Sequence, residues 1–165
     1  MRALITGGSA SGKSDYAERL AMSLGERRLY VATMQPFGDD AAERIARHRK
    51  LRAGRGFLSA DRYTDIGGAD VPPGTDVILL ECIGNLLANE LYMNGTADAI
   101  VSGVLGLAEK AENIVIVTNE VGNDGEAYGD DTMRYIYELG RVNRALARAA
   151  DTVTEVICGI PVKRK

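Results

Sequence analysis

Short apolar runs alternate with longer amphipathic segments along the whole chain. Val77–Leu80 and Ile114–Val117 are continuously apolar, which is typical of central strands that are covered on both faces. Between such runs, apolar residues recur at helical spacing, as they do in the segment that begins at Ser14. This alternation predicts an α/β fold in which a mostly parallel central sheet lies between helices.

The same pattern gives the expected bounds of each element. Strands are expected at Ala3–Thr6, Arg28–Ala32, Phe57–Asp61, Val77–Cys82, Asn113–Thr118 and Thr152–Cys158. Helices are expected at Ser14–Leu24, Asp40–Ala53, Asn85–Met93, Ala97–Ala111 and Thr132–Ala150, with Thr96 capping the fourth. Parallel sheets bind ligands at the carboxyl ends of their strands, so the site is expected in the loops after residues 6, 32, 82 and 118.

A glycine-rich loop joins the first strand to the first helix. It fits the phosphate-binding pattern G-x-x-x-x-G-K-[ST], and it consists of Gly7, Gly8, Ser9, Ala10, Ser11, Gly12, Lys13 and Ser14. In such a P-loop, backbone N–H groups and a helix N-terminus surround the polyphosphate of a nucleotide. Lys13 is expected to reach the β- and γ-phosphates, and the Ser14 hydroxyl is expected to bind Mg²⁺. The loop makes the predicted fold a three-layer P-loop (RecA-like) fold.

Composition and charge narrow the class of protein. A chain of 165 residues is expected to form a single nucleotide-binding domain over residues 1–165. A net charge of −3 argues against a general nucleic-acid binder, and no apolar run approaches the roughly 20 residues of a membrane span. Cys82 and Cys158 lie in apolar runs and are expected to be buried thiols in a reducing compartment. With no room for a signal peptide, the chain is expected in the cytoplasm.

A dense group of cations lies in the segment of residues 40–52, which we call the basic segment. It opens with the capping box Asp40-x-x-Glu43, and at helical spacing Arg44, His48 and Arg52 share one face. Neighbouring positive charges disfavour the imidazolium, and a neutral imidazole is a competent nucleophile. The pattern therefore allows two interpretations. In the first, His48 forms a covalent nucleotidyl-histidine intermediate; in the second, the segment is a solvated basic face that has no function.

Carboxylates follow two of the apolar strands. Glu81 ends the strand at residue 77, and it is the candidate acid that helps to hold Mg²⁺ in P-loop enzymes. Asn119 and Glu120 follow the next strand, so both are expected near the same edge of the sheet. Glu120 serves equally well as a ligand, a base or a cap. The acidic, glycine-containing stretch Asn119–Asp131 is either a mobile loop over the site or an ordinary surface loop.

Several motifs together resemble one family, the bifunctional adenosylcobinamide kinase/adenosylcobinamide-phosphate guanylyltransferases of cobalamin biosynthesis. The P-loop is shared with many enzymes, but the other motifs are more specific, and the similarity covers nearly the whole chain. These motifs are Tyr30-Val31-Ala32-Thr33, Arg44-Ile45-Ala46-Arg47-His48-Arg49, Thr118-Asn119-Glu120-Val121-Gly122, Gly140-Arg141-Val142-Asn143 and Gly159-Ile160-Pro161.

The resemblance implies two reactions and assigns residues to them. A nucleoside triphosphate, ATP or GTP, phosphorylates adenosylcobinamide, and GMP then passes from GTP to the product through a guanylylated His48, releasing pyrophosphate. The P-loop would hold triphosphate. The guanine nucleotide would contact Ala32, Thr33, Met34, Arg49, Lys50, Leu51 and Arg52, with Asp61 and Glu81 at ribose and metal contacts. The resemblance also implies a homotrimer with a corrinoid substrate.

This chain departs from the family pattern at several positions. The family favours Asp at Glu81, Glu at Asp61 and Trp at Phe57, and it continues after T-N-E-V-G toward a V-P pair that is absent here. Three alternatives therefore stay open: a guanylyltransferase that has lost the kinase activity, another P-loop small-molecule kinase in which His48 only binds phosphate, and a non-catalytic nucleotide switch.

Overall fold

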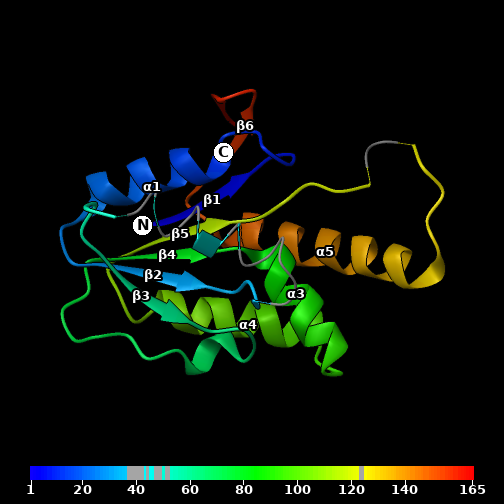
Figure 1. Ribbon diagram of the computed structural model, residues 1–165, viewed down its shortest axis with the longest axis horizontal. Coiled ribbons are helices and arrows are strands. Elements are labelled where there is room, and N and C mark those ends of the chain that lie inside the picture. Colours follow the sequence, from blue (N-terminus) through cyan, green and yellow to red (C-terminus); the bar gives the residue numbers. More distant parts are fainter. Residues whose placement is uncertain (37–42, 44, 47–49, 51–52, 123–124) are drawn as a thin grey trace.

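One seven-stranded sheet forms the middle layer of the protein (Figure 1). The computed structural model describes residues 1–36, 43, 45–46, 50, 53–122 and 125–165. The strands follow the order β3-β2-β4-β5-β1-β6-β7 across the sheet, and only β7 runs antiparallel to its neighbour. Their bounds are β1 Arg2–Thr6, β2 Arg28–Ala32, β3 Phe57–Asp61, β4 Val77–Glu81, β5 Asn113–Val117, β6 Thr152–Ile157 and β7 Ile160–Lys163.

Helices cover both faces of this sheet, which makes the three layers. Helix α1 lies on one face, and α3, α4 and α5 lie on the other (Figure 1). Alternate strand residues point into the two cores: Ile78 and Leu80 pack with α3 to α5, whereas Val77 and Leu79 pack with α1. The helix bounds are α1 Lys13–Leu24, α3 Ile83–Tyr92, α4 Ala97–Ala108 and α5 Asp130–Ala149, with a short 3₁₀ turn η1 at Ile66–Gly68.

The register of the parallel strands brings their carboxyl ends into one row. Asp61 pairs with Ala32, Ala32 with Glu81, and Glu81 with Val117, which in turn pairs with Ile5. We call this side of the sheet the carboxyl edge and the opposite side the amino edge. The loops that follow β1 to β5 therefore meet around one space, as the sequence pattern predicted.

The predicted α/β fold with a mostly parallel sheet is confirmed, and most predicted elements agree with the structure to within two residues. Thr96 caps α4 as predicted, because its side chain accepts a hydrogen bond from the N–H of Ala99 at 3.2 Å. The predicted helix at Asp40–Ala53 lies largely outside the described residues, although Glu43, Ile45, Ala46 and Lys50 are helical. No helix in the described part of the chain is long and apolar enough to span a membrane.

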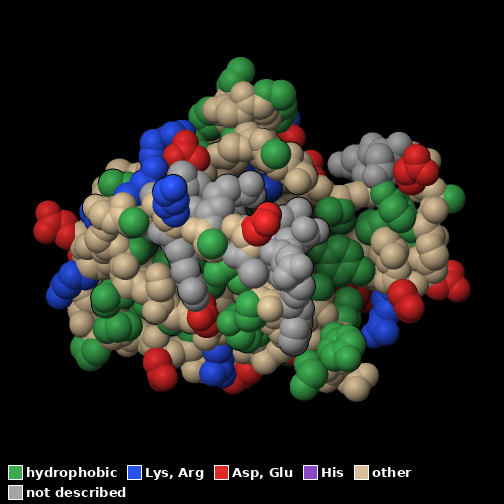
Figure 2. All heavy atoms as spheres, in the orientation of Figure 1, with side chains coloured by type: hydrophobic (Ala, Val, Ile, Leu, Met, Phe, Trp, Pro, Cys, Tyr) green, Lys and Arg blue, Asp and Glu red, His purple; other side chains and the backbone are tan. Residues whose placement is uncertain are grey.

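Strand β7 was not predicted, and the interpretation of Cys158 as a buried thiol was wrong. Ile157 pairs with Ile160, so Cys158 and Gly159 form a two-residue turn in which both residues have positive φ, 50° and 81°. Such a turn reverses the chain tightly and leaves the Cys158 side chain in solvent. Hydrophobic side chains, including Ile160, are exposed at the tip of this hairpin (Figure 2). Cys82, in contrast, is buried as predicted.

Candidate active site

A large open cavity of about 1140 Å³ lies at the carboxyl edge of the sheet. Residues from the loops after β1, β2, β4 and β5, which the sequence singled out, and from the end of β3 line it. The lining residues are 9–15, Tyr30, Ala32, Met34, Pro36, Ile45, Ala46, Ser59, Asp61, Tyr63, Glu81, Cys82, Asn85 and 119–121. The cavity therefore joins most of the motifs that the sequence identified separately.

The P-loop is held in shape by contacts that only glycine permits. Gly12 has φ 90° and directly precedes α1, which places the N-terminus of that helix at the cavity. A Cβ at Gly7 would lie 2.5 Å from the carbonyl oxygen of Val156, so a side chain has no room there. The hairpin turn supports the loop from behind, since the N–H of Gly159 donates to the carbonyl of Ser11 at 2.8 Å. Ser11 Oγ is buried and has no hydrogen-bond partner among the described residues, as suits a donor to phosphate.

Lys13 is the buried cation of this loop. Its side chain curls back so that Nζ donates to the carbonyl of Gly8 at 2.9 Å, and the residue is 9% exposed. Burial lowers the pKa of Lys13, because the ammonium has lost water, and the nearby Cys82 and Glu81 offset part of this effect. An ammonium in this state gains more from a phosphate partner than one that water already solvates.

Glu81 joins the P-loop helix to the sheet. Its Oε1 accepts a hydrogen bond from Ser14 Oγ, and its Oε2 accepts one from the Tyr30 hydroxyl at 3.2 Å. The carboxylate and the hydroxyl oxygen thus meet at the wall of the cavity, beside the ammonium of Lys13. Hard oxygen ligands of this kind suit Mg²⁺, which P-loop proteins hold through few protein groups. The donor set therefore fits the metal that the sequence implied.

Of the residues predicted to contact guanine nucleotide, some line the cavity and one is buried behind its wall. Ala32, Met34 and Asp61 line the cavity, with Asp61 exposed at the end of β3. Thr33 is fully buried and does not line the cavity; its hydroxyl donates to the carbonyl of Cys82 and accepts from the N–H of Cys82, both at 2.8 Å. Thr33 therefore joins the ends of β2 and β4 and fixes the spacing of the cavity wall.

The residues after β5 lie next to the P-loop, as predicted. The N–H of Glu120 donates to the carbonyl of Gly7 at 3.3 Å, and Thr6 Oγ1 lies 3.5 Å from Glu120 Oε1. Asn143 of α5 holds this turn in place, because it accepts from Thr118 Oγ1 at 2.6 Å and donates to the carbonyl of Asn119 at 3.1 Å. Asn143 belongs to one of the family motifs, and its contacts show that this motif residue holds the turn after β5.

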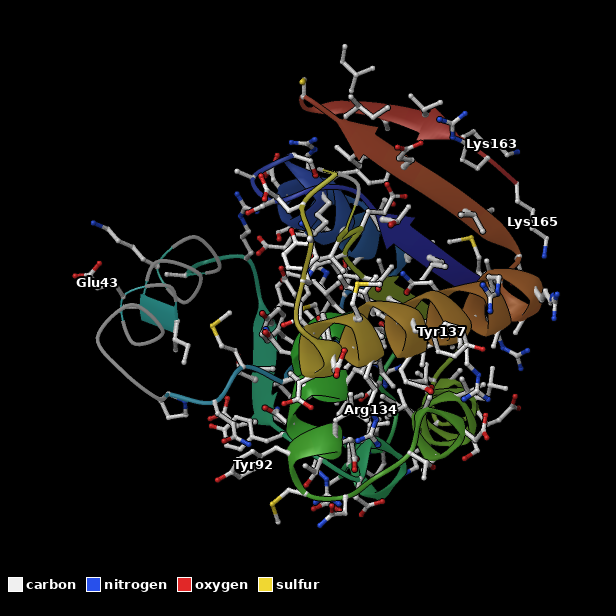
Figure 3. All side chains as sticks on the ribbon, turned by 90° about the vertical axis from the view of Figure 1, so that its right-hand side faces the viewer. Glu43, Tyr92, Arg134, Tyr137, Lys163 and Lys165 are labelled. Carbon is white, nitrogen blue, oxygen red and sulfur yellow. The ribbon has the colours of Figure 1, made fainter. Side chains whose placement is uncertain are left out.

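Two residues of the basic segment reach the cavity. Ile45 and Ala46 line it, whereas Lys50 is helical, exposed and outside the lining. Glu43 is exposed and points away from the sheet (Figure 3). The remaining predicted site residues of this segment, His48, Arg49, Leu51 and Arg52, lie outside the described residues.

The sequence interpretation missed several polar groups of the site, among them two tyrosines and an asparagine. Tyr30, Tyr63 and Asn85 all line the cavity. A buried tyrosine hydroxyl needs a hydrogen-bond partner, so Tyr30 in an otherwise apolar strand was the available signal. Asn85 had a weaker signal, since it follows Glu81 closely at a strand end that was already singled out.

Comparison with known proteins assigns the chain to a family. The family described as "Cobinamide kinase / cobinamide phosphate guanyltransferase" matches residues 3–164. Proteins named "Bifunctional adenosylcobalamin biosynthesis protein CobU" from Escherichia coli (strain K12) and Salmonella typhimurium (strain LT2) are 33% and 35% identical, each over 100% of both chains. A protein named "Bifunctional adenosylcobalamin biosynthesis protein CobP" from Pseudomonas aeruginosa is 30% identical over 100% of this chain and 98% of its own.

The fold is shared more widely than the sequence. The crystal structure of the flagellar accessory protein FlaH from Methanocaldococcus jannaschii superposes with a TM-score of 0.52 at 17% identity, covering 93% of this chain and 70% of that chain. Identity this low supports the fold alone. The full-length relatives and the matched family model carry the assignment further: this chain belongs to the cobinamide kinase / cobinamide phosphate guanyltransferase family.

Proposed function

We propose that this protein phosphorylates adenosylcobinamide with a nucleoside triphosphate and then transfers GMP from GTP to adenosylcobinamide phosphate, in cobalamin biosynthesis. The observation that carries the proposal is that the P-loop and the basic segment line one cavity. Ser14 of the P-loop and Ile45 and Ala46 of the basic segment all face it. A triphosphate held by the loop would thus share the cavity with Ile45 and Ala46, which lie among the cations of the basic segment in the sequence.

The P-loop would hold the triphosphate of either nucleotide. Backbone N–H groups at the start of α1, the Ser11 hydroxyl and the Lys13 ammonium supply donors for its oxygens. Ser14 and Glu81 would hold Mg²⁺, which neutralises phosphate charge when bound. Ala32, Met34 and Asp61 would contact the base and ribose from the ends of β2 and β3.

We assign His48 the role of nucleophile in the guanylyl transfer. A ring nitrogen attacks the α-phosphorus of GTP, the bond between that phosphorus and the bridging oxygen breaks, and pyrophosphate leaves with the electron pair. A phosphate oxygen of adenosylcobinamide phosphate then attacks the same phosphorus, which releases the neutral imidazole and forms adenosylcobinamide-GDP. Arg49, Lys50 and Arg52 supply positive charge for the phosphoryl oxygens in this assignment.

The kinase reaction would use the same phosphate grip. The hydroxyl oxygen of adenosylcobinamide attacks the γ-phosphorus and loses its proton to water, the bond from that phosphorus to the bridging oxygen breaks, and a nucleoside diphosphate leaves with the electron pair. Lys13 stabilises the charge that develops on the transferred group. We further propose a single domain over residues 1–165, a cytoplasmic location and, as the family resemblance implies, a homotrimer.

A labelling experiment tests the guanylyl transfer. The protein is incubated with Mg²⁺ and GTP labelled at the α-phosphate, and it is then denatured. We expect acid-labile label on the wild type and none on His48→Ala. Glu43→Gln is the matched control, because Glu43 belongs to the same basic segment of the sequence but points away from the sheet. It should retain the label.

The alternatives give different results in the same experiment. Absence of covalent label together with γ-phosphoryl transfer to an acceptor would contradict the histidine intermediate and favour a P-loop kinase. Covalent label without phosphorylation of adenosylcobinamide would identify a guanylyltransferase that has lost the kinase activity. Nucleotide binding without either transfer would favour a nucleotide switch.

A further inference from the structure

A partly buried ion pair connects the residues after the basic segment to the P-loop helix. Nη1 of Arg55 lies 2.5 Å from Oε2 of Glu18 on α1 and 3.7 Å from Oδ1 of Asp15. The Glu18 side chain is only 3% exposed, and that of Arg55 is 30% exposed. Because α1 rises by about 1.5 Å per residue, Glu18 lies roughly 7 Å along the helix from Lys13. The pair is thus close to the phosphate grip without lining the cavity.

The backbone around Arg55 is fixed as firmly as its side chain. Gly54 and Gly56 flank it with φ of 82° and 72°, values that favour glycine and turn the chain sharply toward β3. The carbonyl of Arg55 accepts a hydrogen bond from Nη1 of Arg28 at 2.9 Å. Nη2 of Arg28 also donates to the carbonyl of Met22 on α1, at 3.3 Å. Arg55 is therefore tied to α1 directly through Glu18 and indirectly through Arg28.

This connection lies directly after the helical residues that reach the cavity. The N–H of Ala53 donates to the carbonyl of Lys50 at 3.3 Å, so the turn with Arg55 continues from Lys50. Ile45 and Ala46, a few residues earlier, face the cavity together with Ser14 of α1. If Arg55 separated from Glu18, the stretch of chain that begins with Ile45 and Ala46 in the cavity wall would lose its attachment to α1.

We propose that Arg55 is a positioning residue: its ion pair with Glu18 holds the turn at Gly54–Gly56 against the P-loop helix, and so sets the place of Ile45 and Ala46 in the cavity wall. This inference rests on the proposed function, since it concerns the alignment of His48 with the α-phosphate. Arg55 does not line the cavity. A buried carboxylate is costly unless it is paired, which favours a single position of Arg55 over many. Small errors of alignment at a reacting atom lower transfer rates steeply.

Three variants test the role of Arg55. Arg55→Gln removes the charge, Arg55→Lys retains it, and Arg27→Gln is a control that removes an arginine from the ion pair with Asp76 at the amino edge. We expect Arg55→Gln to lower the rate of guanylylation at saturating GTP by about tenfold or more, with GTP affinity nearly unchanged. Arg55→Lys should restore most of the rate, and Arg27→Gln should not lower it.

Amide hydrogen exchange of residues 43–50 gives a readout that does not depend on activity. We expect faster exchange in Arg55→Gln than in the wild type or in Arg27→Gln. A rate loss that lysine does not restore, or that is matched by loss of GTP affinity, would overturn the proposal. If Arg55→Gln does not fold, Glu18→Gln takes its place, because its amide is close in shape to the carboxylate.

Failure of the proposed function leads to a different result. If the wild type takes up no label, the histidine intermediate is wrong, and the exchange measurement decides the positioning role alone. If exchange in Arg55→Gln is faster only in residues 43–50, this result supports the proposal that the ion pair holds these residues in place. Exchange equal to that of Arg27→Gln overturns it.

Discussion

Strand β4 carries a carboxylate at each end, and the two have opposite kinds of surroundings. Asp76, directly before β4 at the amino edge, accepts hydrogen bonds from the backbone N–H groups of Glu26 and Arg27 at 3.0 and 2.9 Å. The guanidinium of Arg27 adds two more, at 2.7 and 3.1 Å. Glu81, at the carboxyl edge, accepts from Ser14 and Tyr30, and all three side chains line the cavity.

The difference separates a carboxylate that serves the fold from one that is available to a ligand. The partners of Asp76 close around it and join the end of α1 to β4, so its hydrogen bonds serve the fold. The partners of Glu81 are side chains that face a space large enough for a nucleotide. A polar cluster that opens onto a cavity has capacity for a ligand, whereas a cluster that is closed on itself stabilises the protein.

The largest effect is expected at the carboxyl edge, from Lys13→Ala. Removing the ammonium should lower both transfer reactions by roughly 100-fold or more, because one preorganised charge on the phosphates is lost. Stability to urea should stay the same or rise, since a buried cation is removed. Steady-state kinetics and urea unfolding measure the two effects. Unchanged nucleotide affinity and turnover would mean that residues 7–14 are not a working P-loop.

A smaller effect is expected from Glu81→Gln. The amide keeps the shape of the side chain but loses the negative charge, so the Mg²⁺ concentration needed for half-maximal transfer should rise by about 10-fold to 100-fold. Activity at saturating Mg²⁺ should recover in part. A Mg²⁺ titration checks this result, with Asp76→Asn as the control at the other end of β4. An unchanged titration curve would remove Glu81 from the metal site.

The smallest effect on activity is expected from Asp76→Asn. The hydrogen bond from Arg27 is the largest of the influences that lower the pKa of Asp76 from 3.8 to about 2. A carboxylate with a lowered pKa stabilises the folded state above its ordinary pKa, and this contribution is lost as pH falls from 3.8 toward 2. Wild type should therefore be more stable than Asp76→Asn near neutral pH, and the two should converge in acid. Urea midpoints against pH measure this, while guanylyl transfer should not change.

Much of the fold was predictable because the central strands are covered on both faces. Apolar runs such as Val77–Leu80 have one explanation in an α/β sheet, so β4 and β5 were predicted to within one residue. The outermost strand, β7, was not predictable in this way. Pro161 lies within β7 and disfavours a strand, yet an edge strand tolerates proline because one side of it makes no ladder bonds.

The site was predictable where local sequence fixes local geometry. The P-loop is such a case, because its glycines and the helix that follows define its shape. Glu81 was singled out because P-loop enzymes carry an acid at the end of another apolar strand, and the structure places it in the cavity lining. The ion pair of Arg55 and Glu18 was not found, because it joins residues 37 positions apart that share no motif. Only the packing of the turn at Gly54–Gly56 against α1 brings them together.

The hairpin of β6 and β7 also bears on the order in which the protein is made. The P-loop, residues 7–14, leaves the ribosome long before the groups that support it, Val156 and Gly159. Strand β1 itself lies between β5 and β6, both of which come much later in the chain. A nascent chain thus carries the phosphate-binding sequence long before it has the phosphate-binding structure. We expect nucleotide to stabilise the fold only after the hairpin has formed, on a chain that already includes β6 and β7.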